Sequence, residues 1–315
     1  MSTKGYNDAN LSTVRKIYDF SKKHPNFSHI FGFTYPMFSR YERKKYFDLS
    51  SSLKKKYGQK IVVNLREYFG LSKLNFMIEF DFDFIDEAVL FDTLSRGDIY
   101  EKDVSNYVLN NFRDGDIFLD VGANIGYYSL LAASLSKSGK VYSVEANPKV
   151  YQRLLNNIKI NGFRNIVVFN IAAGNTNMVT AMDEKGGFFA NGTIVSEKDA
   201  SLLAEGTTNV EMRRLDDLLQ PPVSLIKMDI EGAEPLALQG MSNLLLQPDR
   251  PTLIIEFNPA YNMNMLIQEL PEDYHIDLMD DDGKVIKIET AQLFKLRHTV
   301  NLILSPSNAK VSTKR

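Results

Sequence analysis

One segment constrains the fold most strongly: a short apolar run that enters a glycine-containing loop and then a helical pattern. Residues 117–121 read IFLDV, which is typical of a buried strand. The loop that follows is DVGANIGYYS, residues 120–129, and apolar side chains then recur at helical spacing. Gly122 allows a tight turn close to a ligand, and Gly126 allows the helix to start against the sheet. The segment therefore predicts a ligand site at the carboxyl end of its strand.

Strands and helices alternate after this loop. Asn147 is a suitable N-cap, Pro148 suits the first helical position, and Gly162 suits the end of that helix. Strands separated by helices predict an α/β fold with a mainly parallel, doubly wound sheet. Residues 275–279 and 299–304 could add a closing antiparallel pair. The apolar runs suited to the buried strands are residues 140–145, 166–169, 223–228 and 252–257.

The first 95 residues are predicted to form an N-terminal helical accessory region, because they carry helical periodicity and basic clusters but no catalytic motif. Asp81 and Asp83 alternate with phenylalanines, which predicts a half-buried strand with its acids facing water. Residues 40–60 mix basic and aromatic side chains, which suits an anionic partner or a solvated helix face, and we favour the solvated face. Residues 96–305 are predicted to form the catalytic domain and residues 306–315 a polar tail.

The composition excludes several kinds of chemistry. The chain has no cysteine, so disulfides, cysteine-ligated zinc, iron–sulfur clusters and thiol nucleophiles are impossible. Its formal net charge of -2 gives no overall electrostatic reason to expect nucleic acid as a partner. No stretch approaches the roughly 18 consecutive apolar residues of a membrane span, and the N-terminus lacks the pattern of a secretory signal. These features predict a cytoplasmic address, and the charge favours a small or neutral substrate.

The loop also discriminates between nucleotide cofactors. Asn124 stands where a dinucleotide fingerprint requires a second glycine, since a pyrophosphate must rest on bare backbone. S-adenosylmethionine has no phosphate, and its ammonium favours a nearby acid such as Asp120. Glu145, at the end of the next strand, is placed to accept both ribose hydroxyls, a role that nicotinamide-dependent enzymes share. We therefore predict S-adenosylmethionine as the cofactor.

Four segments together resemble the FkbM family of methyltransferases. They are DVGANIGYYS, then VEANP at 144–148, KMDIEGAE at 227–234 and IEFNP at 255–259, and the resemblance covers about residues 95–305. It implies a Rossmann-like class I methyltransferase fold with a mainly parallel, seven-stranded sheet. It also implies O-methylation of a hydroxyl, usually on a sugar or a polyketide-type natural product.

The resemblance assigns residues to the cofactor. Glu145 would bind the ribose, and Asp229 would lie at the methionine end near the acceptor. The adenine pocket is marked only by small apolar surface around Ala172. The loop residues that would line S-adenosylmethionine are Gly122, Asn124 and Gly126.

The acidic turn after residues 223–228 contains the candidate general base. A neutral hydroxyl is a poor nucleophile, and a base that removes its proton would add roughly 10² to 10⁴ in rate. Asp229 and Glu231 could face the same side if the backbone stays extended, so we predict Glu231 as the base. The competing interpretation for Glu231 and Glu234 is stabilisation of a helix start. His298 is a second candidate base.

Two further hypotheses concern the acceptor side. Asp229 and Glu231, with Glu256 or Asn258, could instead bind Mg²⁺ and orient acceptor oxygens, because hard oxygen ligands suit that ion. Glu256 and Asn258 are otherwise predicted to contact the acceptor. Asn191, in a glycine-rich segment, fits an acceptor-side lid or an ordinary surface turn.

Three rival functions remain open. A nucleic-acid methyltransferase is disfavoured by the acidic turn, which would repel phosphates, but a ribose hydroxyl acceptor stays possible. A nicotinamide-dependent Rossmann oxidoreductase is disfavoured by Asn124 and by the lack of an evident hydride-transfer set. A non-catalytic module would bind the cofactor without turnover. The identity of the acceptor, the metal dependence and the oligomeric state do not follow from the sequence.

Overall fold

The computed structural model describes residues 35–183, 193–195, 207–219, 222–257, 263–296 and 299–307. These residues form two compact units, and each is described by itself. The first comprises the described residues up to Ile61 together with Asp81–Val89. The second comprises Val62–Phe80 and the described residues from Leu90 onward. The predicted accessory region is thus divided between both units, and the domain boundary near residue 95 remains a prediction.

The first unit is built on helix α2 (Tyr35–Tyr57). Ser50 Oγ donates a hydrogen bond to the carbonyl oxygen of Phe82, and Lys54 forms an ion pair with Asp83. The predicted strand at residues 80–84 is wrong in extent, since β2 (Met77–Asp81) ends at Asp81 and a turn follows. Asp81 is buried, not solvated, and the hydrogen bond that its carboxylate accepts from the Asp83 amide and its ion pair with Lys60 compensate for the loss of water.

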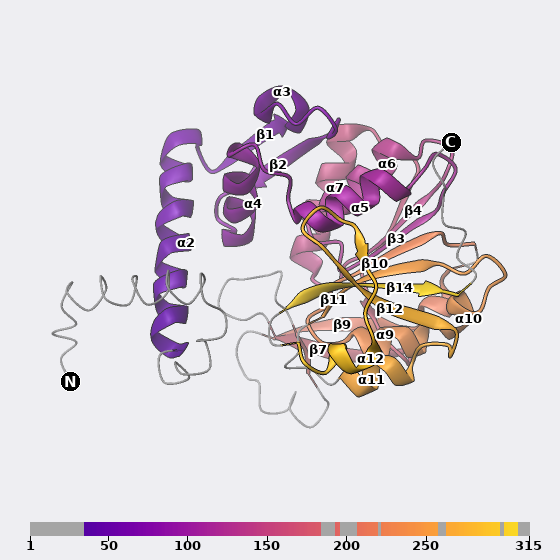
Figure 1. The fold of residues 1–315 in the computed structure, drawn as a ribbon. Coiled ribbons are helices and arrows are strands. Elements are labelled where there is room, and N and C mark those ends of the chain that lie inside the picture. The colour runs from indigo at the N-terminus through magenta and orange to yellow at the C-terminus, as the bar shows by residue number, and fades with distance from the viewer. Residues whose placement is uncertain are drawn as a thin grey trace. The chain divides into compact units, whose positions relative to one another are not determined.

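The second unit contains an eight-stranded sheet whose spatial order is β13-β12-β14-β11-β10-β3-β4-β5 (Figure 1). Strands β5, β4, β3, β10 and β11 run parallel, and β14, β12 and β13 are antiparallel to their neighbours. The mainly parallel Rossmann-like sheet and the closing antiparallel pair are therefore confirmed. The strand bounds are β3 Phe118–Val121, β4 Val141–Val144, β5 Ile166–Phe169, β10 Leu225–Met228, β11 Thr252–Phe257, β12 Tyr274–Met279, β13 Val285–Ile286 and β14 Val300–Pro306.

The expected count of seven strands is exceeded by β13. This edge strand has only two residues, both exposed, so it carries no hydrophobic pattern that a sequence could reveal. A second sheet of four strands, in the order β6-β9-β7-β8, was also not predicted. Its strands are β6 Ala172–Ala173, β7 Met178–Asp183, β8 Thr193–Val195 and β9 Thr207–Arg213.

Helices cover both faces of the large sheet, with α5, α6 and α7 on one side and α9 to α12 on the other (Figure 1). Helix α7 has the predicted caps: Asn147 Oδ1 accepts hydrogen bonds from the amides of Lys149 and Val150, and Gly162 ends the helix in a left-handed conformation. None of the described helices combines the length and the hydrophobicity needed to span a bilayer. The helix bounds are α3 Leu65–Phe69, α4 Ile85–Ser95, α5 Lys102–Asn111, α6 Tyr127–Leu135, α7 Pro148–Asn161, α9 Glu234–Gly240, α10 Ser242–Leu245, α11 Met263–Gln268 and α12 Thr290–Leu293.

The strand register brings the predicted site residues to one edge of the sheet. Val121 lies opposite both Val144 and Met228, and Met228 lies opposite Ile255. The residue after each of Val144, Met228 and Ile255 therefore lies at the carboxyl edge of the parallel strands, as does the residue before Val121 in β3. That edge is where ligands bind in open α/β sheets. The acidic residues gathered there are Asp120, Glu145, Asp229 and Glu256.

Candidate active site

The loop after β3 approaches the end of β10 closely. Gly122 has φ +84°, and a Cβ atom there would lie 1.9 Å from the backbone oxygen of Asp229. Gly126 has φ +99°, and its Cβ would lie 2.5 Å from Leu154 Cδ1. Asn124 also adopts a left-handed conformation, with φ +50°. Glycine is therefore needed at 122 for contact with the neighbouring strand, and the loop presents its backbone at the edge of the sheet.

Glu145 holds this loop from the end of β4. Its Oε2 accepts a hydrogen bond from the Asn124 amide at 2.9 Å, and its Oε1 accepts one from the Asn147 amide at 2.8 Å. Burial raises the pKa of Glu145 to about 7, although the two backbone donors lower it. A carboxylate oxygen has more than one lone pair, so each can accept a further hydrogen bond. The geometry is thus compatible with the predicted ribose contact.

Asp120 is completely buried, and among the described residues only one of its two carboxylate oxygens has a hydrogen-bond partner. Its Oδ2 accepts a hydrogen bond from Ser129 Oγ at 2.6 Å, but its Oδ1 has no partner among the described residues. Burial raises the pKa of Asp120 to about 6, while the nearby Lys227 ammonium lowers it. A buried carboxylate oxygen without a partner is unfavourable, which points to a ligand group or an ordered water at this position. An ammonium would satisfy it, so the site fits the methionine end of S-adenosylmethionine.

The acidic turn after β10 is closed by Glu234. This buried side chain accepts hydrogen bonds at Oε1 from the amides of Ile230 and Gly232, at 3.2 and 3.3 Å. Glu234 therefore has the structural role that was the competing interpretation. Glu231 has φ +54°, so the extended backbone required for Asp229 and Glu231 to face the same side is not present. The turn, not strand alternation, sets where Glu231 lies.

Lys227 was missed as a site residue. It is buried in β10, and its Nζ lies 3.0 Å from Asp229 Oδ2 and 5.1 Å from the centroid of the Tyr128 ring. Burial lowers the pKa of Lys227, but carboxylates around it, Asp229 first, together hold it above its ordinary value. A lysine inside the otherwise apolar run LIKM was the available signal.

Glu101 was also missed, because it lies upstream of every recognised motif. Its carboxylate accepts a hydrogen bond from the Tyr128 hydroxyl at 2.7 Å. Burial raises the pKa of Glu101, and Lys227 lowers it. Glu256, on β11, responds to the same groups: burial raises its pKa to about 8, with further contributions from Asp229 and Glu101. These residues are therefore electrostatically connected at the carboxyl edge, where the acceptor is predicted to bind.

The remaining predictions concern the adenine pocket, the metal ion and three residues outside the described ranges. Ala172 is buried in β6, and its place in the adenine pocket remains a prediction. Within the described part of the chain, no group of three or more His, Asp or Glu side chains is arranged to hold a metal ion, so the magnesium hypothesis gains no support. The predicted residues outside the described residues are Asn191, Asn258 and His298.

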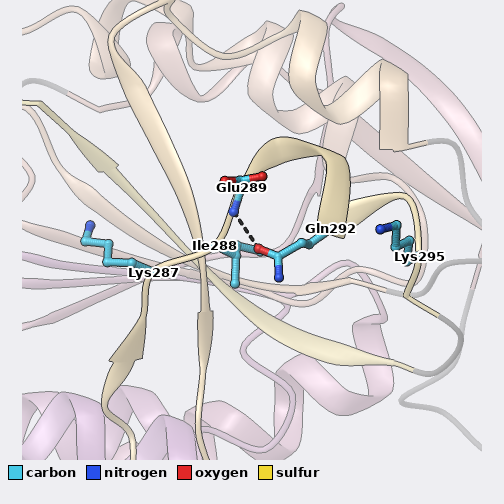
Figure 2. Close-up of a pocket in the computed structure, with 5 residues that line it drawn as sticks. All are labelled: Lys287, Ile288, Glu289, Gln292 and Lys295. Carbon is cyan, nitrogen blue, oxygen red and sulfur yellow. Dashed lines mark hydrogen bonds between the residues drawn. The ribbon is translucent and has the colours of Figure 1, made fainter.

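A pocket of about 590 Å³ lies elsewhere, near α12. Figure 2 shows its lining, in which the Glu289 amide donates a hydrogen bond to Gln292 Oε1 at 2.7 Å. That contact belongs to the capping box that starts α12. The pocket contains none of the predicted site residues, so we attribute no function to it. Its lining residues are Lys287, Ile288, Glu289, Gln292 and Lys295.

A Rossmann-like sheet with an acid-lined carboxyl edge and a loop without a dinucleotide fingerprint is compatible with a class I methyltransferase. Residues 120–291, more than half of the chain, match the methyltransferase FkbM domain. The chain therefore belongs to the FkbM methyltransferase family, as its motifs predicted.

Curated relatives are similar over parts of the chain. A tRNA(Phe) (4-demethylwyosine(37)-C(7)) aminocarboxypropyltransferase of Methanocaldococcus jannaschii is 34% identical over 73 residues, which is 23% of this chain and 28% of that protein. The hexuronic acid methyltransferase AglP of Haloferax volcanii is 27% identical over 146 residues, 46% of this chain and 58% of AglP. The chain thus spans less than two thirds of the length of both proteins. Methyltransferase sdnD of Sordaria araneosa is 24% identical, with 56% and 79% covered.

Among solved structures, the methyltransferase FkbM of Methylobacillus flagellatus is similar, with a TM-score of 0.43 and 18% identity. The similarity covers 70% of this chain and 54% of that one.

Proposed function

We propose that the protein transfers the methyl group of S-adenosylmethionine to a hydroxyl oxygen of a sugar, glycan or natural product. The observation that carries the proposal is the carboxyl edge of the sheet, where Glu145 is anchored across the loop and Asp120 keeps a buried oxygen without a partner. The name of the hexuronic acid methyltransferase AglP supports a sugar acceptor.

The cofactor roles follow from the position of each group. When bound, S-adenosylmethionine supplies a methyl group already activated by its sulfonium. Glu145 would accept hydrogen bonds from the ribose hydroxyls, and Asp120 would bind the ammonium directly or through a water. Gly122 and Gly126 leave the loop backbone open to the ligand, while Ala172 would border the adenine. Positioning of this kind can supply several kcal/mol towards a displacement reaction.

The acceptor end requires a proton acceptor for the attacking hydroxyl. We keep Glu231 as the proposed base, with Asp229 held by Lys227 at the methionine end of the cofactor. Glu256, together with Asn258 and Asn191, would orient the acceptor, and His298 is the second candidate base. Removal of Glu231 should then lower the rate of transfer more than the affinity for the cofactor.

An acceptor screen with methyl-labelled S-adenosylmethionine tests the function directly. Neutral methyl glycosides, uronic acid glycosides and total RNA serve as probes, each with and without a chelator. We expect label in a glycoside and none in RNA, and Glu145→Gln should abolish it at low cofactor concentration. Labelling confined to RNA, with a strong dependence on salt, would instead show a ribose methyltransferase. A requirement for Mg²⁺ would restore the metal hypothesis.

A further inference from the structure

The segment Tyr100–Glu101 brings a carboxylate to the acceptor end from outside the matched domain, which begins at residue 120. Glu101 precedes α5, and the Tyr128 hydroxyl donates a hydrogen bond to its Oε2. Tyr128 belongs to α6, the helix that follows the cofactor loop, and its ring lies beside Lys227. Glu101 is thus tied to both the loop helix and the lysine of β10.

The backbone at Glu101 has a positive φ, as it does at two other residues of the site. Among the described residues, three residues other than glycine have positive φ: Glu101 at +38°, Asn124 at +50° and Glu231 at +54°. All three belong to segments that meet at the carboxyl edge of the sheet. Strained conformations of this kind persist where the surrounding structure enforces them, and they concentrate at functional sites.

Among the residues that the structure describes, the charges in this region do not balance. Lys227 interacts with Asp229, Glu101 and Asp120, and Glu256 interacts with Asp229, Glu101 and Lys227. One ammonium therefore faces several carboxylates, with Glu231 adding a further acid near Glu256. The unpartnered Asp120 Oδ1 in the same network, which a ligand group or an ordered water would satisfy, is an independent sign of a ligand site. When the carboxylates of this network are ionised, their excess negative charge favours a cationic ligand.

We propose that Glu101 faces the methyl-bearing sulfonium and, with Asp229 and Glu256, makes this site prefer the cationic cofactor over its neutral-sulfur product. The inference rests on the proposed function. S-adenosylhomocysteine lacks the sulfonium charge but keeps the ribose, the adenine and the ammonium. Glu101 therefore contributes to discrimination between the two ligands, not to nucleoside binding as such.

Calorimetric titration with sinefungin and S-adenosylhomocysteine tests this without an acceptor. Sinefungin carries a protonated amine near the place of the methylsulfonium and is not consumed. We expect Glu101→Gln to weaken sinefungin binding about tenfold and to change S-adenosylhomocysteine binding by less than about twofold. Asp98→Asn, an exposed acid in the same loop, is the matched control and should change neither.

A structural role for Glu101 predicts a different pattern. Equal weakening of both ligands, or no change in either, would overturn the proposal. Thermal unfolding of each variant checks that the fold is kept, and Tyr128→Phe, which removes the hydrogen bond to Glu101 but keeps the ring, should lower the preference for sinefungin partially. Absence of binding of both ligands to the wild-type protein would overturn the proposed function as well, which separates the two failures.

Discussion

The two sides of the carboxyl edge are built differently. On the proposed cofactor side, Glu145 is fixed by backbone amides from its own neighbourhood and from the adjacent loop. On the proposed acceptor side, Glu101, Tyr128 and Lys227 are side chains from three distant segments that contact one another. The backbone donors to Glu145 stay in place whatever side chains their residues carry, whereas both partners of a side-chain pair can be lost by single substitutions. The cofactor side therefore suits a constant ligand, and the acceptor side can be altered without rebuilding the sheet.

The largest expected effect is on the cofactor side. Gly122→Ala places a Cβ atom 1.9 Å from a backbone oxygen of Asp229, at a positive φ that alanine disfavours. We expect the free energy of unfolding to fall by about 3 kcal/mol or more. Gly162→Ala is the matched control, because it also has positive φ but meets nothing within 4 Å, so it should lose only about 1 kcal/mol. Urea denaturation measures the free energy of unfolding of both variants. Equal losses would show that the close contact at Gly122 does not add to the cost of the substitution.

A smaller loss is expected on the acceptor side. Lys227→Met removes the ammonium that the buried Asp120 and the partly exposed Asp229 share. The free energy of unfolding at pH 7.5 should fall by about 2 kcal/mol, less than for a fully buried pair because Asp229 is reached by solvent. The loss should shrink at pH 5, because burial raises the pKa of Asp120 to about 6 and its carboxyl group is then largely protonated. Lys102→Met, whose ion pair with Asp282 is exposed, should show no measurable change, and an equal loss there would contradict the account.

The pH dependence sharpens the comparison further. Burial raises the pKa of Asp120 to about 6, of Glu145 to about 7 and of Glu256 to about 8. Raised carboxylate pKa values stabilise the folded state at low pH, and this contribution is lost as the pH rises through those values. A cationic ligand needs the ionised forms, with Lys227, Asp229 and Glu101 beside them, so its affinity should rise over the same range.

Thermal unfolding with and without saturating sinefungin measures this effect. The increase in Tm that sinefungin produces should be larger at pH 8 than at pH 5.5 by about 3 °C or more. S-adenosylhomocysteine should show a weaker trend, because it lacks the charge near the acceptor end. A ligand-induced shift that is constant across this pH range would contradict the raised pKa values.

Local patterns predicted the backbone of the proposed cofactor side. The loop with Gly122 and Gly126, the parallel pairing of the central strands, and the helix between Asn147 and Gly162 all follow from short-range spacing and were confirmed. Such features depend on residues a few positions apart, so the sequence displays them directly.

The acceptor side could be predicted only in part. Glu101 and Lys227 meet through Tyr128 only after the chain folds, and no spacing in the sequence connects them. The Glu234 carboxylate accepts hydrogen bonds from amides of its own loop. Composition alone cannot decide whether such an acid stabilises a helix start or takes part in catalysis. The residue pattern also does not reveal the left-handed backbone at Glu231, because the surrounding turn imposes it.

Binding of the nucleoside through Glu145 is the central claim, and calorimetry with S-adenosylhomocysteine and NAD tests it most directly. The wild-type protein should bind S-adenosylhomocysteine and not NAD, because Asn124 occupies the position where a pyrophosphate needs glycine. Glu145→Gln should bind S-adenosylhomocysteine about 10- to 100-fold more weakly, as expected when charged hydrogen bonds to two hydroxyls are lost. Tight binding of NAD, or unchanged affinity of Glu145→Gln for S-adenosylhomocysteine, would contradict the account.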